Sequence, residues 1–119
     1  MKKFIYIIVL VIFAMACEKD EQQVNVTYRL SNAIAETELS YRNIDGQIIA
    51  ETVQIESLED VWTKSQEMNK GDIVYLSAIY YDSTSSVKIQ ILIDGKVYKE
   101  GSNSNSPEEY LTISGTIPY

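Results

Sequence analysis

The sequence predicts an all-β fold, a single antiparallel β-sandwich of about seven short strands. Apolar and polar residues alternate with a period of two along most of the chain from residue 24 onward, which is typical of strands with one side in solvent. Turn signals rich in Gly, Asn and Asp recur between these segments. No segment shows a convincing long helical period, and short strands at regular intervals are typical of a sandwich.

The first two strands are predicted by clear alternation. Their apolar-side residues are Val24, Val26, Tyr28 and Leu30 in the first, and Ala35, Thr37, Leu39 and Tyr41 in the second. Residues 43–46 have the sequence Asn-Ile-Asp-Gly, a turn signal in which Gly46 can take a positive φ. The return strand is predicted over residues 48–55, with its two faces less cleanly separated.

Residues 56–72 are the hardest to interpret. Leu58, Val61 and Trp62 fit the i, i+3, i+4 spacing of one helical turn. The run is short, however, and Trp62 and Thr63 are β-prone, so the preferred prediction is a loop followed by a short strand. An Asn-Lys-Gly-Asp turn at residues 69–72 ends the segment.

The second half of the chain contains the most apolar strands. Residues 73–81 are apolar on both faces, which predicts a central strand covered on both sides for much of its length. After a polar loop, residues 87–93 alternate again, and Asp94-Gly95 joins them to residues 96–99. This two-residue connection is the strongest hairpin signal in the chain. We expect residues 101–109 to be polar and flexible and residues 111–117 to form the last strand.

The start of the chain predicts export and lipid attachment. Two lysines precede an apolar run of 13 residues from Phe4 to Ala16, which is shorter than the roughly 20 residues of a membrane span. Ala14-Met15-Ala16-Cys17 resembles the lipobox of bacterial lipoproteins, in which the cysteine receives a diacylglyceryl group. The alternative is a plain secretory signal in which Cys17 is incidental. We therefore divide the chain into a signal peptide (1–16), a lipidated Cys17 with a polar tether (17–23) and the sandwich (24–119).

Composition excludes several functional classes. The net charge is −7 and the predicted mature part contains no basic run, so nucleic acid is not an expected partner. Histidine is absent and Cys17 is the single cysteine, which excludes an internal disulfide, a thiolate metal site and the usual nucleophile–histidine pairs. Lys64 beside Ser65 has no spacing that supports a dyad. We expect no catalytic residues, no metal and no cofactor.

Several segments of the sequence resemble those of a known protein family. They are residues 26–30 (VTYRL), 39–46 (LSYRNIDG), 71–78 (GDIVYLSA), 87–97 (VKIQILIDGKV) and 113–116 (ISGT). In order and spacing they are similar to the soluble domain of the small mycobacterial membrane protein (MmpS-type) family, also carried by small Bacteroidetes-type lipoproteins. The resemblance covers residues 24–117. It implies an immunoglobulin-like β-sandwich outside the membrane and an accessory role beside RND-type transporters.

This chain departs from the family pattern at three places. The Pro-Trp that often follows the third strand is absent, because Trp62 follows Asp60 and Val61. The late cysteines of the mycobacterial members are absent as well. The anchor is a predicted lipid on Cys17 in place of a membrane helix.

The aromatic residues supply the only candidate contact surface. Trp62, the single tryptophan, is interpreted either as a core residue or as an exposed residue at a binding rim. Tyr80 and Tyr81 are adjacent at a strand end, so their side chains face opposite ways and one of them should reach solvent. Together with Trp62 they form the predicted contact surface, although sheets also favour tyrosine for structural reasons.

These features predict a non-enzymatic, lipid-anchored protein of the bacterial cell envelope, held at the outer membrane and facing either the periplasm or the cell surface. It is expected to act through protein–protein contacts made by sheet edges and by the loops at one end. The expected partner is an envelope or transporter protein, as for an accessory of an RND-type transport or assembly complex. The alternative is a binding module for a small apolar molecule, a lipid or a glycan.

Overall fold

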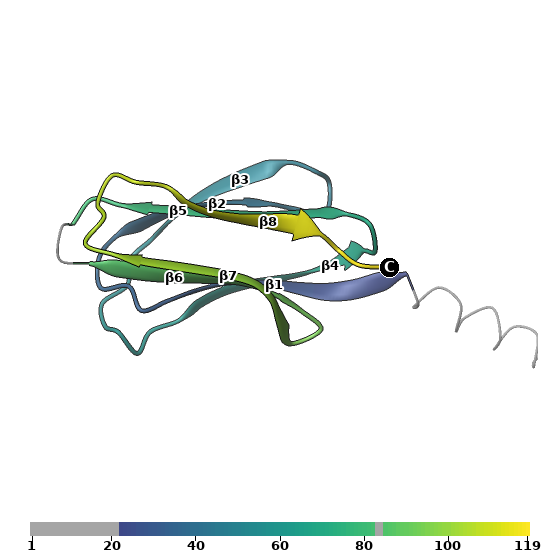
Figure 1. The fold of residues 1–119 in the computed structure, drawn as a ribbon, viewed down its shortest axis with the longest axis horizontal. Helices are drawn as coiled ribbons and strands as arrows, with labels where there is room; N and C mark the ends of the chain where they lie inside the picture. Colours follow the sequence, from purple (N-terminus) through teal and green to yellow (C-terminus); the bar gives the residue numbers. More distant parts are fainter. Residues whose placement is uncertain (1–21, 83–84) are drawn as a thin grey trace, which may run out of the picture.

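The computed structural model describes residues 22–82 and 85–119, which form two four-stranded antiparallel sheets packed face to face (Figure 1). The first sheet has the order β4 (Trp62–Asn69), β1 (Gln23–Ser31), β6 (Ser86–Ile93) and β7 (Lys96–Ser104). The second sheet has the order β3 (Ile48–Val53), β2 (Thr37–Arg42), β5 (Ile73–Tyr80) and β8 (Leu111–Thr116). The predicted antiparallel β-sandwich is confirmed, with eight strands. The predicted leader, Cys17 and nearly all of the tether lie outside the described residues.

The strand order was left open by the sequence. The β2–β3 and β6–β7 hairpins each stay within one sheet, and the other connections between consecutive strands cross from one sheet to the other. In an immunoglobulin domain the first two strands lie in one sheet, whereas here β1 and β2 lie in opposite sheets. β1 is a central strand of the first sheet, and β2 and β5 are central in the second. Most pairings therefore join segments that are distant in the sequence, and neither sheet is complete before the C-terminal half of the chain is in place.

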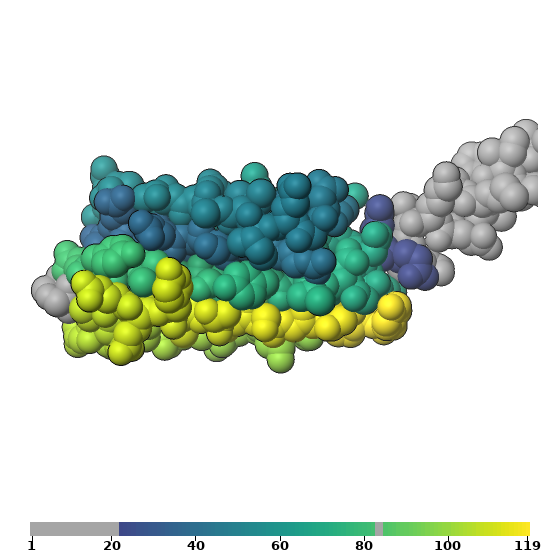
Figure 2. All heavy atoms as spheres, turned by 90° about the horizontal axis from the view of Figure 1, so that it is seen from above, coloured from purple at the N-terminus to yellow at the C-terminus, as the bar shows by residue number. Residues whose placement is uncertain are grey.

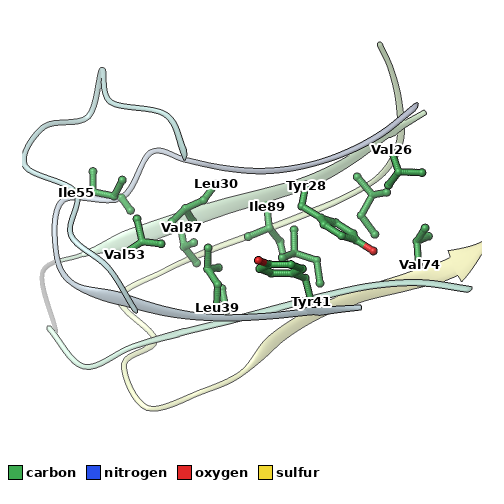
Figure 3. Packing of buried hydrophobic residues seen from close by; sticks show 14 of the residues in the cluster. Val26, Tyr28, Leu30, Leu39, Tyr41, Val53, Ile55, Val74, Val87 and Ile89 are labelled. Atoms are coloured by element: carbon green, nitrogen blue, oxygen red, sulfur yellow. The ribbon is translucent and has the colours of Figure 1, made fainter. Parts of the chain in front are cut away.

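The core lies between the two sheets and consists of the inward rows that alternation predicted. Figure 3 shows Tyr28 and Leu30 from β1, Leu39 and Tyr41 from β2, and Ile89 from β6 pointing into the space between the sheets. The largest fully buried side chains are Tyr28, Tyr80, Leu30, Leu39, Met68, Leu76, Ile89, Ile91 and Ile117. Removing this apolar surface from water is the main driving force for folding.

Two predictions of local structure need correction. The segment predicted as a loop and a short strand contains an eight-residue strand, β4, because it pairs with β1 along its whole length, from Trp62 opposite Leu30 to Asn69 opposite Gln23. β7 continues to Ser104, into the segment predicted to be flexible, because it pairs with the first residues of β6. The prediction that residues 73–81 form a central strand covered on both sides for much of its length is confirmed, because Ser77 and Ile79 on the outer side of β5 are buried and Ile73 is exposed at one end.

The Asp94-Gly95 hairpin between β6 and β7 is confirmed. Asp94 has φ of 50° and Gly95 has φ of 82°, so both central residues take the left-handed conformation that a type I′ turn requires. The register of β6 and β7 shifts after Ile91, which places a bulge on β7 next to this turn.

One side of the sandwich is closed where β7 and β8 meet. The Tyr98 hydroxyl of β7 donates a hydrogen bond to the Thr116 carbonyl of β8 at 2.7 Å. Gly115 lies beneath the Tyr98 ring, and Gly101 of β7 faces Leu111 and Ile113 of β8. A side chain at either glycine would meet these neighbours, so the absence of a Cβ lets the two edge strands approach each other.

We expect Gly115→Ala to lower the free energy of unfolding by about 1–3 kcal/mol through overpacking. The new methyl would lie 2.8 Å from a carbon of the Tyr98 ring, and the hydrogen bond to Thr116 prevents that ring from moving away freely. Urea denaturation measures the change. Ser114→Ala, on the exposed side of the same strand, is the control and should stay within about 0.5 kcal/mol of the parent. Equal stability of the two variants would contradict the tight β7–β8 contact.

Candidate functional site

A concave surface lies on the outer side of the second sheet, where two hollows share Glu38. The first has a volume of about 460 Å³ and is lined by Ile34, Ala35, Glu36, Glu38, Gln54, Tyr81 and Asp82. The second has a volume of about 300 Å³ and is lined by Glu38, Leu39, Ser40, Ala50, Glu51, Thr52, Ile79 and Tyr110. We call the surface that these residues form the acidic face. Figure 2 looks onto this side of the sheet, with β3 and β2 in blue, β5 in green and β8 in yellow.

A band of small side chains crosses the second sheet, and Ala50 and Ser40 of this band line the second hollow. Ala50, Ser40, Ser77 and Thr112 are register partners on β3, β2, β5 and β8, and all have short side chains. Ser77 is only 3% exposed although it lies on the outer side, and its hydroxyl is 2.9 Å from the Thr112 hydroxyl. These residues form a low band beside the larger Ile79 and Glu38 of the next row.

Two exposed tyrosine rings border the hollows. Tyr81 is 57% exposed and Tyr110 is 70% exposed. The Tyr81 hydroxyl donates a long hydrogen bond of 3.4 Å to Glu38 Oε2, and the Glu38 charge is the main cause that raises the pKa of Tyr81, with the side chain of Tyr110 contributing less. The two rings therefore flank one carboxylate at the boundary between the hollows.

Tyr80 has a structural role instead of a contact role. It is fully buried, so of the predicted pair only Tyr81 reaches solvent. Its hydroxyl accepts a hydrogen bond from the Ser106 N–H at 3.0 Å, and its carbonyl accepts one from the Glu108 N–H at 2.8 Å. Tyr80 thereby holds the segment between β7 and β8 against the end of β5, and this segment carries Tyr110.

Trp62 does not belong to the acidic face. Its half-buried ring lies 5.8 Å from the Tyr41 ring, centroid to centroid, and the Tyr41 ring lies 5.4 Å from that of Tyr28 inside the core. Tyr41 points to the inner side of the second sheet, whereas Tyr81 lies on the outer side. The sheet therefore separates Trp62 from Tyr81, and the predicted surface of Trp62, Tyr80 and Tyr81 does not form one patch.

The acidic face is suited to ligands that donate hydrogen bonds or carry positive charge. The Glu36, Glu38 and Asp82 side chains line the hollows, whereas the Glu51 carboxylate lies on the inner side and accepts a hydrogen bond from Tyr41. The residues that line the hollows include no lysine or arginine. Exposed tyrosine rings attract cations and the apolar faces of ligands. In the part of the chain that the structure describes, no group of three or more carboxylates, cysteines or histidines is arranged to hold a metal ion.

Sequence reasoning missed Glu38, Ile79 and Tyr110 as members of a site. From the sequence alone, alternation places Glu38 on the solvent side of a strand, and Tyr110 is one of nine tyrosines. The available signal was Ile79, an apolar residue on the outer row of a strand, in a segment of sequence where no covering helix is predicted. Only the register of β2, β5 and β8 shows that these residues surround a hollow.

We expect Tyr41→Phe to change the alkaline stability of the protein. Tyr41 donates a hydrogen bond of 2.5 Å to Glu51 Oε2, and burial, together with Glu51, raises the pKa of Tyr41 to about 12. Folding therefore favours the protonated phenol, and this contribution is complete below pH 10 and lost between pH 10 and 12. The variant should lose about 1–2 kcal/mol at pH 8 and show a shallower decline above pH 10.

Urea denaturation between pH 8 and pH 12 measures this difference. Part of the decline should remain in the variant, because burial also raises the pKa of Tyr28. Tyr119→Phe, at an exposed position, is the control and should keep the parent profile. A Tyr41→Phe profile parallel to that of the parent at all pH values would show that Tyr41 makes no such contribution.

We expect Glu38→Gln to lower the pKa of Tyr81 toward its ordinary value, because the neighbouring carboxylate is the largest cause of the upward shift. Titration of the tyrosine ¹³Cζ signals by NMR measures this change. Glu67→Gln, on the exposed β4 of the other sheet, removes the same charge as a control. If both variants leave the Tyr81 titration unchanged, Glu38 and Tyr81 do not share the acidic face as described.

No helix long and apolar enough to cross a membrane occurs among residues 22–82 and 85–119. Cys17, the predicted site of lipid attachment, lies outside these ranges, so the structure does not describe it. A scan against models of known protein families finds no match, and no curated protein matches the chain.

Proposed function

We propose that the chain is a non-enzymatic, lipid-anchored cell-envelope protein that binds a partner protein through the acidic face. The observation that carries this proposal is the pair of hollows that share Glu38 and are bordered by Tyr81 and Tyr110. Exposed tyrosines around a recessed surface are typical of protein contact sites. The anchor is the lipid on Cys17, supported by the lipobox-like sequence before it.

The position of the acidic face fits a tethered protein. The chain enters β1 at the end of the sandwich where the C-terminus also lies (Figure 1). Tyr81 follows β5 at the opposite end of the sandwich, next to the β5–β6 connection. The first hollow therefore lies at the end that a tether at the N-terminus leaves free. The partner class suggested by the MmpS-type resemblance is an RND-type transport or assembly complex.

The size of the hollows favours one second candidate, a binding module for a small apolar molecule, a lipid or a glycan. Volumes of about 460 and 300 Å³ lie at the lower end of the range of small-molecule sites. Both hollows are open, and their lining includes the carboxylates of Glu36, Glu38 and Asp82, which suits a hydroxyl-rich or amine-bearing ligand better than an apolar one. A ligand that remains with the purified protein in native mass spectrometry would favour this second function.

Site-specific photo-crosslinking in the native envelope tests the proposal. A benzophenone amino acid replaces Tyr81 or Tyr110 in the full chain, or Thr63 of β4 as an exposed control on the other sheet. We expect one defined adduct from positions 81 and 110 and none from position 63. Adducts of equal yield at all three positions, or none at any position in correctly anchored protein, would overturn the acidic face as the contact surface.

The anchor is tested separately. Cys17→Ser should move the protein from the membrane fraction to the soluble fraction after a carbonate wash, because two or three acyl chains are needed for stable anchoring. A Cys17→Ser variant that stays in the washed membranes would contradict lipid attachment at this residue.

A further inference from the structure

β3 is the least protected edge strand of the sandwich. Natural sheets protect their edges with lysine, proline, bulges or a covering segment. β4 carries Lys64, and β7 carries Lys96, Lys99 and a bulge. β8 is tied to β7 through the Tyr98 hydroxyl. β3 has the sequence IIAETV, with neither lysine nor proline, and in the described part of the chain no strand lies beyond it.

The hydrogen-bond pattern shows which backbone groups this edge presents. The Asn43 N–H donates to the Gln47 carbonyl at 2.9 Å, which makes these two residues a hydrogen-bonded pair at the start of the β2–β3 hairpin. Hydrogen-bonded and non-hydrogen-bonded pairs alternate along an antiparallel ladder. In the observed register Ile48, Ala50 and Thr52 therefore belong to non-hydrogen-bonded pairs. Their N–H and C=O groups point away from β2, toward the free edge.

The side chains of the same three residues lie on the outer side of the sheet, at the acidic face. Ile48 is 56% exposed, whereas Ala50 and Thr52 are short and line the second hollow. Thr52 is the register partner of Glu38. A strand added beside β3 would lie about 10 Å from β2, and a long basic side chain on it could reach over Ala50 and Thr52 to the Glu38 carboxylate.

We propose that β3 takes up an extended basic segment of a partner protein as a fifth strand of the second sheet. Main-chain hydrogen bonds to Ile48, Ala50 and Thr52 hold the segment, as in other cases of strand addition. Its lysine or arginine side chains lie in the second hollow toward Glu38, where no cationic side chain lines the surface. This inference rests on the proposed function and specifies the partner's chemistry and its mode of binding.

The test uses the full chain in detergent micelles and a heptapeptide of alternating lysine and valine with blocked ends. One comparison peptide has glutamate in place of lysine. Another keeps the lysines but is N-methylated at alternate residues, so that it cannot pair with an edge. We expect the first peptide to bind at least tenfold tighter than either comparison peptide. It should also slow amide hydrogen exchange at residues 48, 50 and 52, as measured by NMR.

Three variants test the β3 edge, the charge of Glu38 and a control position. Ala50→Lys places a cation on the β3 edge, and Thr63→Lys adds the same charge to exposed β4 of the other sheet. We expect Ala50→Lys to weaken binding of the lysine peptide at least tenfold and Thr63→Lys to change it less than twofold. Glu38→Gln, which keeps the edge intact, should weaken binding by about threefold.

Three results would overturn strand addition at β3. They are the absence of binding by the lysine peptide, equal binding of the N-methylated peptide, and unchanged exchange at residues 48, 50 and 52. The photo-crosslinking experiment separates these results from failure of the proposed function. Adduct formation from positions 81 and 110 that is unaffected by Ala50→Lys leaves the acidic face as the contact surface and rejects the β3 edge. Loss of all adducts in the parent chain rejects the proposed function itself.

Discussion

The structure depends on one main-chain acceptor between the two sheets, the carbonyl of Arg42. The fully buried Tyr28 of β1 donates to it at 2.7 Å, and Gln66 of β4 donates to it at 3.0 Å. Both donors belong to the first sheet, while Arg42 ends β2 in the second. A buried hydrogen-bonding group left without a partner costs about 1–3 kcal/mol. The two sheets therefore favour the relative position in which Tyr28 and Gln66 both reach the Arg42 carbonyl. Apolar packing alone would tolerate more sliding between the sheets.

Arg42 also fixes the local geometry of the second sheet. Its guanidinium group donates to the Ile73 carbonyl at 3.1 Å, at the start of β5, and the β2–β3 hairpin begins at the next residue. The start of the hairpin after Arg42 sets the register of β3 along β2. This register pairs Thr52 with Glu38. The core link at Arg42 and the outer surface at Glu38 are thus set by one strand, β2.

The sequence predicted those parts of the fold that bury an apolar row. β1, β2 and β6 alternate between apolar and polar residues, and their inward residues are those expected. The sequence predicted a short strand after the loop but not the full extent of β4, because an edge strand buries little and its residues Thr63, Lys64 and Ser65 are polar. The acidic face could not be predicted, because it arises from cross-strand register. Ala50, Ser40, Ser77 and Thr112 are ordinary strand residues until three separate strand pairings align them.

The strands of the two sheets differ in charge, which the net charge of the whole sequence does not show. The strands of the first sheet carry Arg29, Lys64, Lys88, Lys96 and Lys99 against Glu67 and Glu100. Those of the second sheet carry Arg42 against Glu38 and Glu51. The acidic face therefore lies on the less cationic layer. A field of this kind favours approach of a positive partner from one side and orients it before contact.

The burial of Tyr80 has a consequence for the thermodynamics of recognition. Its two hydrogen bonds to Ser106 and Glu108 fix the backbone that carries Tyr110 during folding, before any ligand arrives. A loop that must become ordered on binding loses conformational entropy at that moment, and this loss lowers affinity. Here the segment is already ordered in the folded protein, so this conformational entropy is lost on folding and not on binding. The rim of the hollow is preorganised, so a partner needs to immobilise little beyond the exposed tyrosine rings themselves.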